Sequence, residues 1–352
     1  MKKALLLMVV MLGSVTMSAQ NLARKESRQI QSFLSQISEK GVTNAQVLQI
    51  NDLTNPATWH GVTIENGHIV SIDWKDKRVA GRLDLSGFTA LTRVDVSHNY
   101  LMWLSVAGCT SLTQLNASRN ILSNIDMTGC SVLDQVDISR NRLTELTMSG
   151  TPLIRNLNCS HNLFVDLNVS GAMKLETLSC QDCRLENLLI DGCTALKNLY
   201  CGYNRLTSLN LIGVESLSVL SVDDNRISTM LISGLPSLST LMCSGNNMTK
   251  LVVRDCKVLM DLICSYNNLT ELSVEQCPAL VFVDCSYNNL TELNLSSQYF
   301  LQRLLCNNNL LTMLDVSFDQ ELTYVNCRYN MITDLRTLST PNLRMVAAQW
   351  NF

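Results

Sequence analysis

The chain has 352 residues, of which 46% are hydrophobic and only 5% aromatic, and its formal net charge is −3. This charge argues against the polybasic surface of proteins that bind nucleic acid or anionic membranes. The glycine-rich phosphate-binding motifs and the G-x-S-x-G nucleophile motif are absent, so we expect no catalytic residue and no cofactor.

Residues 1–19 are predicted to be a secretory signal peptide. Lys2 and Lys3 form its charged start, Ala4 to Leu12 its apolar stretch, and Ala19 precedes a cleavage point. An uncleaved anchor is the alternative, although the apolar stretch is short for a membrane span. The mature chain is therefore predicted to be secreted or held at the cell surface, or released into a periplasm, without membrane insertion.

Residues 20–68 are predicted to form an amino-terminal cap with one amphipathic helix. Ile30, Phe33, Leu34 and Ile37 stand at helical spacing, and Gly41 suits a helix end. Such a helix would cover the apolar side of the first repeat, as the ends of repeat arrays require. A helix that binds a partner independently is the alternative.

Residues 69–352 are predicted to form a solenoid of 13 turns and part of a 14th, because they repeat every 21 residues. An Asn recurs from Asn99 to Asn351, with Cys183 replacing it once, and a Leu, Ile or Val lies eight and five residues before it. Each repeat reads LxxLxVxxN and then LxxLxVxxGC, which leaves no room for a long helix. We expect mostly β-strand and coil, with a parallel sheet on the inner face and a second extended segment on the opposite wall.

The Asn column is predicted to be structural, with side-chain amides that hydrogen-bond the main chain where it turns. The 14 cysteines fall into two inward columns and the Asn slot of Cys183. We interpret them as mostly buried free thiols, because parallel side chains in register suit the disulfide dihedral angle poorly. Disulfides are the alternative in an exported chain. Cys180 and Cys183 form the only C-x-x-C pair, so no metal site is predicted.

The stretch Leu-x-x-Leu-x-Cys-x-x-Asn-x-Leu-x-x-Leu at 259–272 resembles the leucine-rich repeat family. The 21-residue length and the nested second half are similar to the IRREKO-type class of bacterial leucine-rich repeats. A shorter stretch, from Trp59 to Ile72, resembles the caps that precede many such repeats, without the cysteines often found there. The resemblance implies an arc or superhelix used for protein–protein contact, in the broad role of the internalins, which bind host surface proteins.

The predicted binding surface is a strip of variable residues on the inner face. The residue before each Asn slot runs from basic, as at Arg119, through acidic, as at Asp182, to aromatic near the carboxy terminus. Exposed aromatic residues are favoured binding anchors. The alternative is that these tyrosines only stack along the repeats and stiffen them. The candidate protein-binding residues are Tyr200, Tyr203, Tyr266, Phe282, Tyr287, Leu305, Tyr324, Tyr329 and Trp350.

These features predict a secreted or surface-exposed bacterial interaction module that binds a protein ligand through its inner face, without enzymatic activity. The first alternative is a structural spacer that self-associates through its carboxy-terminal end, where the final turn stops half-way at Trp350, Asn351 and Phe352. The second alternative is carbohydrate binding through the aromatic strip. We expect a monomer, with an end-to-end dimer as the alternative.

Overall fold

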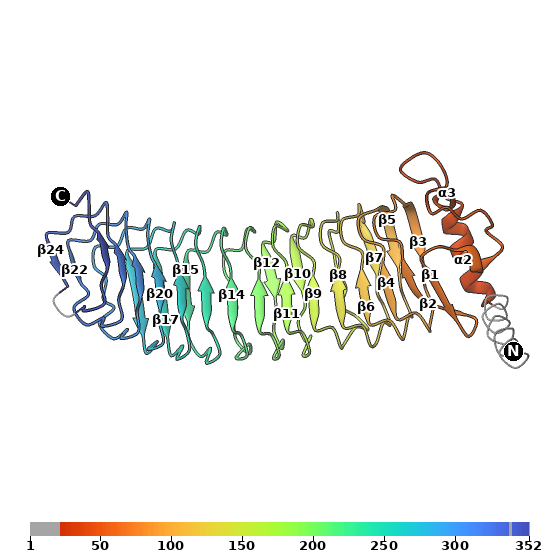
Figure 1. Ribbon diagram of the computed structural model, residues 1–352. Coiled ribbons are helices and arrows are strands. Elements are labelled where there is room, and N and C mark those ends of the chain that lie inside the picture. Colours follow the sequence, from red (N-terminus) through yellow and green to blue (C-terminus); the bar gives the residue numbers. More distant parts are fainter. Residues whose placement is uncertain (1–21, 338–339, 352) are drawn as a thin grey trace, which may run out of the picture. The chain divides into compact units, whose positions relative to one another are not determined.

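The computed structural model describes residues 22–337 and 340–351, so the predicted signal peptide lies outside the described residues. The chain divides into two compact units, unit 1 ending at Asn168 and unit 2 beginning at Val169 (Figure 1). In the described part, no helix combines the length and the apolar character needed to cross a membrane.

The cap of unit 1 contains helix α2 (Arg24–Leu34), the short helix α3 (Asn44–Val47) and the 3-10 turn η1 (Pro56–Thr58). Ile30, Phe33 and Leu34 on α2 are buried, which agrees with the predicted apolar face. The prediction for Ile37 is wrong, because the helix ends at Leu34 and the Ile37 side chain is 59% exposed. Gly41 has a left-handed backbone, with φ of +76°, in the turn between the two helices instead of at the end of α2.

Side chains of the cap close the open edge of the first repeat. The ring of Phe33 stacks on that of Trp74, with centroids 5.3 Å apart. The Asn44 side chain donates to the Ala80 carbonyl at 2.9 Å and accepts from the Ala80 N–H at 3.0 Å. The Gln36 side chain makes the same two bonds with Arg82, each 2.8 Å long. These amides replace a neighbouring strand and satisfy an edge that would otherwise be free to pair.

The strands of unit 1 lie in two walls. In the first wall, β1 (Val62–Glu65) pairs antiparallel with β2 (His68–Asp73), and the parallel strands β4 (Arg93–Asp95), β6 (Gln114–Asn116), β8 (Gln135–Asp137) and β9 (Asn156–Asn158) follow. The second wall contains the parallel strands β3 (Ala80–Asp84), β5 (Tyr100–Ser105) and β7 (Asn124–Asp126). The strand β10 (Asp166–Asn168) ends the unit.

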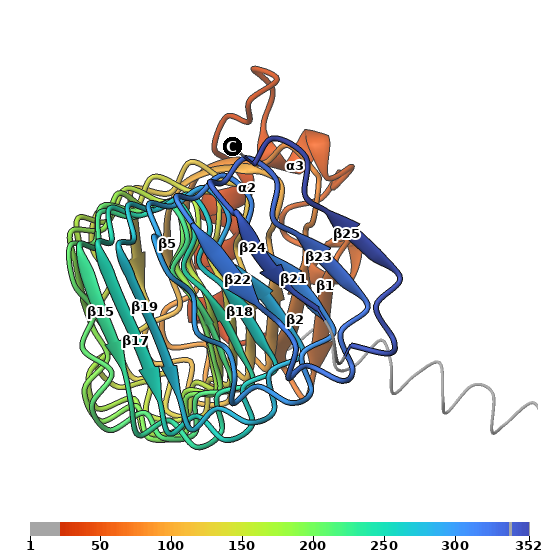
Figure 2. The same cartoon turned by 90° about the vertical axis from the view of Figure 1, so that its left-hand side faces the viewer.

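Unit 2 has the same two walls, and Figure 2 shows its second-wall strands β15 (Thr229–Ile232), β17 (Lys250–Arg254) and β19 (Glu271–Glu275) side by side. Partners in these sheets are 21 residues apart, as in Leu199 opposite Leu220, which confirms the predicted parallel register. The first wall contains β11 (Thr177–Ser179), β13 (Asn198–Tyr200), β14 (Val219–Ser221), β16 (Thr240–Met242), β18 (Asp261–Ile263), β20 (Phe282–Asp284), β21 (Arg303–Leu305), β23 (Tyr324–Asn326) and β25 (Met345–Ala347). The second wall contains β12 (Asn187–Leu189), β15 (Thr229–Ile232), β17 (Lys250–Arg254), β19 (Glu271–Glu275), β22 (Met313–Asp315) and β24 (Asp334–Arg336).

The Asn column forms the predicted ladder. The Asn120 amide donates to the carbonyl of Val96 in the preceding turn at 2.9 Å and to that of Ala117 in its own turn at 3.1 Å. Its side-chain oxygen accepts from the Leu101 N–H at 2.9 Å. The same pattern recurs at Asn141, Asn162, Asn225, Asn246, Asn267, Asn288, Asn309 and Asn330.

The cysteines are buried in the two inward columns. Cys130 donates through its sulfur to the Val106 carbonyl of the preceding turn at 3.1 Å, and Cys193 makes the corresponding bond to Val169 at 3.2 Å. Burial raises the pKa of Cys201 and of Cys285 to about 12, so these groups stay protonated at neutral pH.

Strand pairing in the second wall is interrupted in three turns that lack Cys at one of these slots. Among the described residues, segments 145–148, 208–211 and 292–295 form no strand. In each of these turns the slot that holds Cys in the preceding turn holds Thr151, Val214 or Gln298 instead. The turns with Ala172, Leu235 and Asp319 at this slot keep the strands β10, β15 and β22, so the loss of Cys does not by itself remove the strand.

Candidate interaction surface

The first-wall strands of unit 1 present a polar face whose groups bond within their own turns. The Asp95 carboxylate accepts from the N–H and the hydroxyl of Ser97, at 3.1 and 2.6 Å. Asp137 makes the same pair of bonds with Ser139, at 3.0 and 2.6 Å. Because these side chains are already satisfied, this face offers few groups that would gain from a partner.

Six of the corresponding positions on the first-wall strands of unit 2 carry large apolar side chains, among polar residues such as Asp261 and Asp284. We call this set the apolar strand face. Each member lies at the first or last position of a three-residue strand, next to an inward-pointing residue, and is half-buried. Four members were predicted as binding residues, and Met242 and Ile263 join them. The members are Tyr200, Met242, Ile263, Phe282, Leu305 and Tyr324.

Arg303 organises the aromatic part of this face. It lies opposite Phe282 on one neighbouring strand and opposite Tyr324 on the other. Its guanidinium carbon is 5.3 Å from the centroid of the Phe282 ring and 5.6 Å from that of the Tyr324 ring. Cation–π attraction from both sides therefore holds the three side chains as one group.

An apolar cavity of about 300 Å³ opens beside the apolar strand face, where strands β18, β20 and β21 begin. The side chains of Met260 and Phe300 at its wall are 46% and 59% exposed. The cavity was not predicted, although Met260 and Val281 replace the polar residues found at this position in many other turns. Its lining is Met260, Pro278, Ala279, Val281, Phe300 and Gln302.

The other predicted aromatic residues lie in the turns after the strands instead of on the strand face. Tyr203, Tyr266, Tyr287, Tyr329 and Trp350 each have a left-handed backbone, with φ between 54° and 67°. All are exposed, from 43% at Tyr287 to 61% at Tyr203. The strip that was predicted as one surface is thus two, and we call the second one the turn column.

Aromatic rings of the turn column stack in pairs. The Tyr266 and Tyr287 centroids are 4.3 Å apart with ring planes 8° from parallel, and those of Tyr329 and Trp350 are 6.0 Å apart at 4°. The pKa of Tyr266 is raised, by desolvation first and then by Tyr287. These two pairs therefore stack as the alternative prediction describes. Tyr203 has no aromatic neighbour in the column, because Asp182 and Asp224 stand on either side of it.

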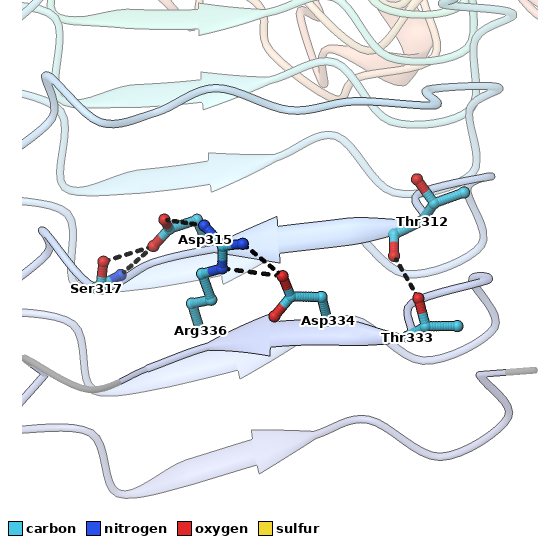
Figure 3. A network of polar contacts seen from close by, with 6 residues as sticks. All are labelled: Thr312, Asp315, Ser317, Thr333, Asp334 and Arg336. Carbon is cyan, nitrogen blue, oxygen red and sulfur yellow. Dashed lines mark hydrogen bonds and ion pairs between the residues drawn. The ribbon is translucent and has the colours of Figure 1, made fainter.

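The second wall contains a larger cavity, of about 740 Å³, at the interruption between β19 and β22. Its carboxylates include Glu271, which pairs with Lys250 at 2.7 Å, and Asp315. Figure 3 shows Asp315 beside Ser317, which donates to it at 2.6 Å and lowers its pKa. Arg336 lies 3.8 Å from the same carboxylate. These acidic groups are satisfied locally, which favours a structural role.

Nothing in the described chain brings three or more metal-ligating side chains together. Cys180 and Cys183, the one C-x-x-C pair of the sequence, are both buried. Both units display side chains on regular surfaces, and the first wall of unit 2 carries half-buried apolar side chains with an apolar cavity beside them.

No protein-family model matches the chain, and no curated protein matches it. Solved structures do match. YopM from Yersinia enterocolitica is 24% identical with a TM-score of 0.62, over 81% of this chain and 67% of that one. The internalin InlF from Listeria monocytogenes is 17% identical with a TM-score of 0.60, over 91% and 94%. YopM from Yersinia pestis, described as a leucine-rich effector protein, is 20% identical with a TM-score of 0.59, over 74% and 78%.

The chain has the leucine-rich repeat fold. This confirms the predicted resemblance and the predicted parallel-sheet solenoid. At these identities the likeness concerns the fold, and the leucine-rich repeat itself assigns neither a ligand nor a site.

Proposed function

We propose that this leucine-rich repeat chain is an exported bacterial interaction module that binds a protein ligand through the apolar strand face of unit 2. The observation that carries the proposal is the group of half-buried apolar side chains between Tyr200 and Tyr324, interspersed with polar residues such as Asp284, with an apolar cavity beside it. Large apolar patches on soluble proteins mark interaction sites, and aromatic and Arg side chains dominate binding energy in such sites.

The composition of the face favours a protein over the other ligand classes. Phe282, Arg303 and Tyr324 form a preorganised group of the residue types enriched at protein interfaces. The cavity bounded by Met260 and Phe300 suits one apolar side chain of a partner. The predicted signal peptide at residues 1–19 supports export, and binding is proposed in place of catalysis because the surface holds anchors and no arranged acid–base pair.

The test transplants the polar face of unit 1 onto unit 2. The variant Phe282→Gln, Leu305→Asn and Tyr324→Gln introduces residues that occupy the same positions in β6 and β8. The matched control is Arg93→Ala, Gln114→Ala and Gln135→Ala on the strands of unit 1. Each mature protein is immobilised, exposed to host-cell and bacterial surface extracts, and checked by circular dichroism for an intact fold.

We expect the wild type and the control to retain the same protein and the face variant to bind it at least about tenfold more weakly, since loss of one hot-spot side chain alone costs this much. Equal retention by the folded face variant would remove the site from this face. No retained partner, together with a molar mass that rises with concentration in light scattering, would favour the self-associating spacer.

A further inference from the structure

The turn column contains an opening between its two aromatic pairs. Tyr266 stacks on Tyr287, and Tyr329 stacks on Trp350, but the turn between these pairs carries Asn308. All five residues have the same left-handed backbone, with φ between 54° and 67°, so their side chains leave the backbone in equivalent directions. The Asn side chain is shorter than tyrosine by a whole ring. One ring face of Tyr287 and one of Tyr329 therefore look towards each other across the Asn308 turn.

The width of this opening follows from the repeat. Successive parallel strands lie about 4.8 Å apart, so Tyr287 and Tyr329, two turns apart, are separated by about 9–10 Å. A flat group in van der Waals contact with both faces needs only about 7–8 Å, because each contact places carbon atoms 3.5–4.0 Å apart. A guanidinium or an aromatic ring is thus too thin to touch both faces, whereas a puckered saturated ring fits.

The base of the opening is an amide with unused capacity. The Asn308 main chain is engaged, since its N–H donates to Arg328 at 2.9 Å and its carbonyl accepts from Asn288 at 3.1 Å. Its side chain makes no hydrogen bond to another described residue and offers two donors and an acceptor. The Asn326 amide donates to the Asn307 side-chain oxygen at 2.9 Å beside it. Arg328 occupies the column of Asn307 in the next turn, where its Nε donates to the Gln349 side chain. Neutral amides below aromatic walls suit a ligand with vicinal hydroxyl groups and C–H faces.

We propose that Tyr287, Asn308 and Tyr329 form a binding slot for one neutral pyranose ring of a glycan. The two aromatic faces contact the C–H groups of the sugar, and the Asn308 amide hydrogen-bonds its hydroxyl groups. The slot lies in the turn column, so it is separate from the apolar strand face and does not depend on the protein-binding function proposed above.

The test fills the slot without removing an aromatic residue. Asn308→Tyr continues a column in which four neighbouring turns already accept an aromatic side chain, so this variant is expected to fold. Cellohexaose, mannohexaose and maltohexaose are titrated into the wild type by calorimetry and by saturation-transfer NMR. A high-mannose glycoprotein, before and after enzymatic removal of its glycan, distinguishes a glycan on protein from a free polysaccharide. Tyr203→Ala is the control, because this exposed tyrosine has no aromatic neighbour in the column.

We expect at least one neutral oligosaccharide to bind the wild type and the Tyr203→Ala control equally. Binding should weaken by at least about tenfold in Asn308→Tyr and in Tyr287→Ala, and the face variant Phe282→Gln, Leu305→Asn and Tyr324→Gln should keep it. Unchanged binding by Asn308→Tyr, or no binding of any of these probes to the wild type at millimolar concentration, overturns the proposal. Tighter binding of a hexa-arginine peptide than of any sugar, lost in Asn308→Tyr, overturns it in favour of a cationic peptide.

Discussion

Units 1 and 2 share a repeat and an Asn ladder, but their first walls present different chemistry. In unit 1 the outward positions of β4, β6 and β8 are polar, and groups such as Asp95 bond to a serine two residues later. In unit 2 several of the same positions carry Met242, Ile263, Phe282 and Leu305, although Asp284 keeps the polar pattern and bonds to Ser286. The ladder and the inward leucines determine the fold in both units, so the outward positions are free to differ. The difference between the faces is therefore the part of the structure that bears on function.

The largest predicted effect is the slow alkylation of the buried thiols in the folded protein. We expect it to be equally slow in both units. All 14 cysteines are buried, and burial raises the pKa of Cys109 in unit 1 and of Cys285 in unit 2 to about 12. We expect alkylation of the folded, unreduced protein to be roughly a thousandfold slower than after unfolding in guanidinium. Mass spectrometry with time gives the rate for each cysteine. Fast labelling confined to one unit would show that its core is open, and few reactive thiols after unfolding would indicate disulfides.

Loss of one ladder Asn should cost both units the same. Asn120→Ala in unit 1 and Asn288→Ala in unit 2 each leave one buried N–H without a partner and remove one of the two amide donors from two carbonyls. We expect each to lower the free energy of unfolding by about 2–5 kcal/mol, at roughly 1–3 kcal/mol for the unsatisfied N–H and about 0.5–1 kcal/mol for each lost bond to a carbonyl. Urea unfolding followed by circular dichroism measures the two variants. A much smaller loss in either unit would show that its ladder is not the common scaffold.

Asp319 in unit 2 occupies a slot that holds Cys109 in unit 1. Its side chain is buried, one oxygen has no hydrogen-bond partner, and burial, with a smaller effect of Asp315, raises its pKa to about 7. Because this folded-state pKa exceeds the ordinary value of 3.8, the folded state binds the proton more tightly, and stability is lost as pH rises from about 4 to 7.

Asp319→Cys should therefore raise the free energy of unfolding at pH 8 by about 2–4 kcal/mol and change it little near pH 4, at 1.36 kcal/mol per pKa unit. Thermal unfolding at pH 4, 6 and 8 measures this. The converse change in unit 1, Cys109→Asp, should produce a protein that is less stable at pH 8 than at pH 5. A pH-independent effect of Asp319→Cys would show that the pKa of Asp319 is not raised in the folded state.

The smallest effect concerns the cation–π contacts, one set in each unit. Arg303→Gln removes the contacts to Phe282 and Tyr324, and Arg82→Gln removes the contact to Trp103 at 4.6 Å. At these partly exposed sites we expect each variant to lower the free energy of unfolding by about 1 kcal/mol or less. If Arg303 instead contributes chiefly to ligand binding, its variant will weaken capture of the partner while Arg82→Gln leaves it unchanged.

The repeat, the parallel sheet and the ladder could be predicted because each depends on residues that recur at a fixed spacing. The left-handed turn before each Asn could not, since the column holds His98, Arg119 and Tyr266, and such residues seldom adopt positive φ on their own. The ladder imposes that conformation. Because the turn conformation could not be predicted, the aromatic residues were predicted to form one surface, although Tyr266 lies in a turn and Phe282 in a strand.

The cap and the second wall were harder to predict because they depend on single residues. Gln36 and Asn44 resemble any polar residues of a loop until they are seen beside β3. The interruptions of the second wall fall in the turns of Thr151, Val214 and Gln298, but other turns lack the same cysteine and still form strands, so the missing cysteine does not predict an interruption. The cavity at Met260 did leave a signal, because an apolar residue stands where many turns have Thr, Ser or Lys.

In the left-handed turns, the backbone conformation does not depend on which side chain the residue carries. At thirteen positions from His98 to Trp350, imidazole, guanidinium, carboxylate, amide, phenol and indole groups, and the bare glycine Gly245, all follow the same path of the main chain. A non-glycine residue in this conformation costs roughly 1–2 kcal/mol, and the chain accepts that cost in twelve turns. The turn column therefore accepts side chains of very different chemistry at equivalent backbone positions. Single substitutions in this column can change what the surface recognises without a change of fold.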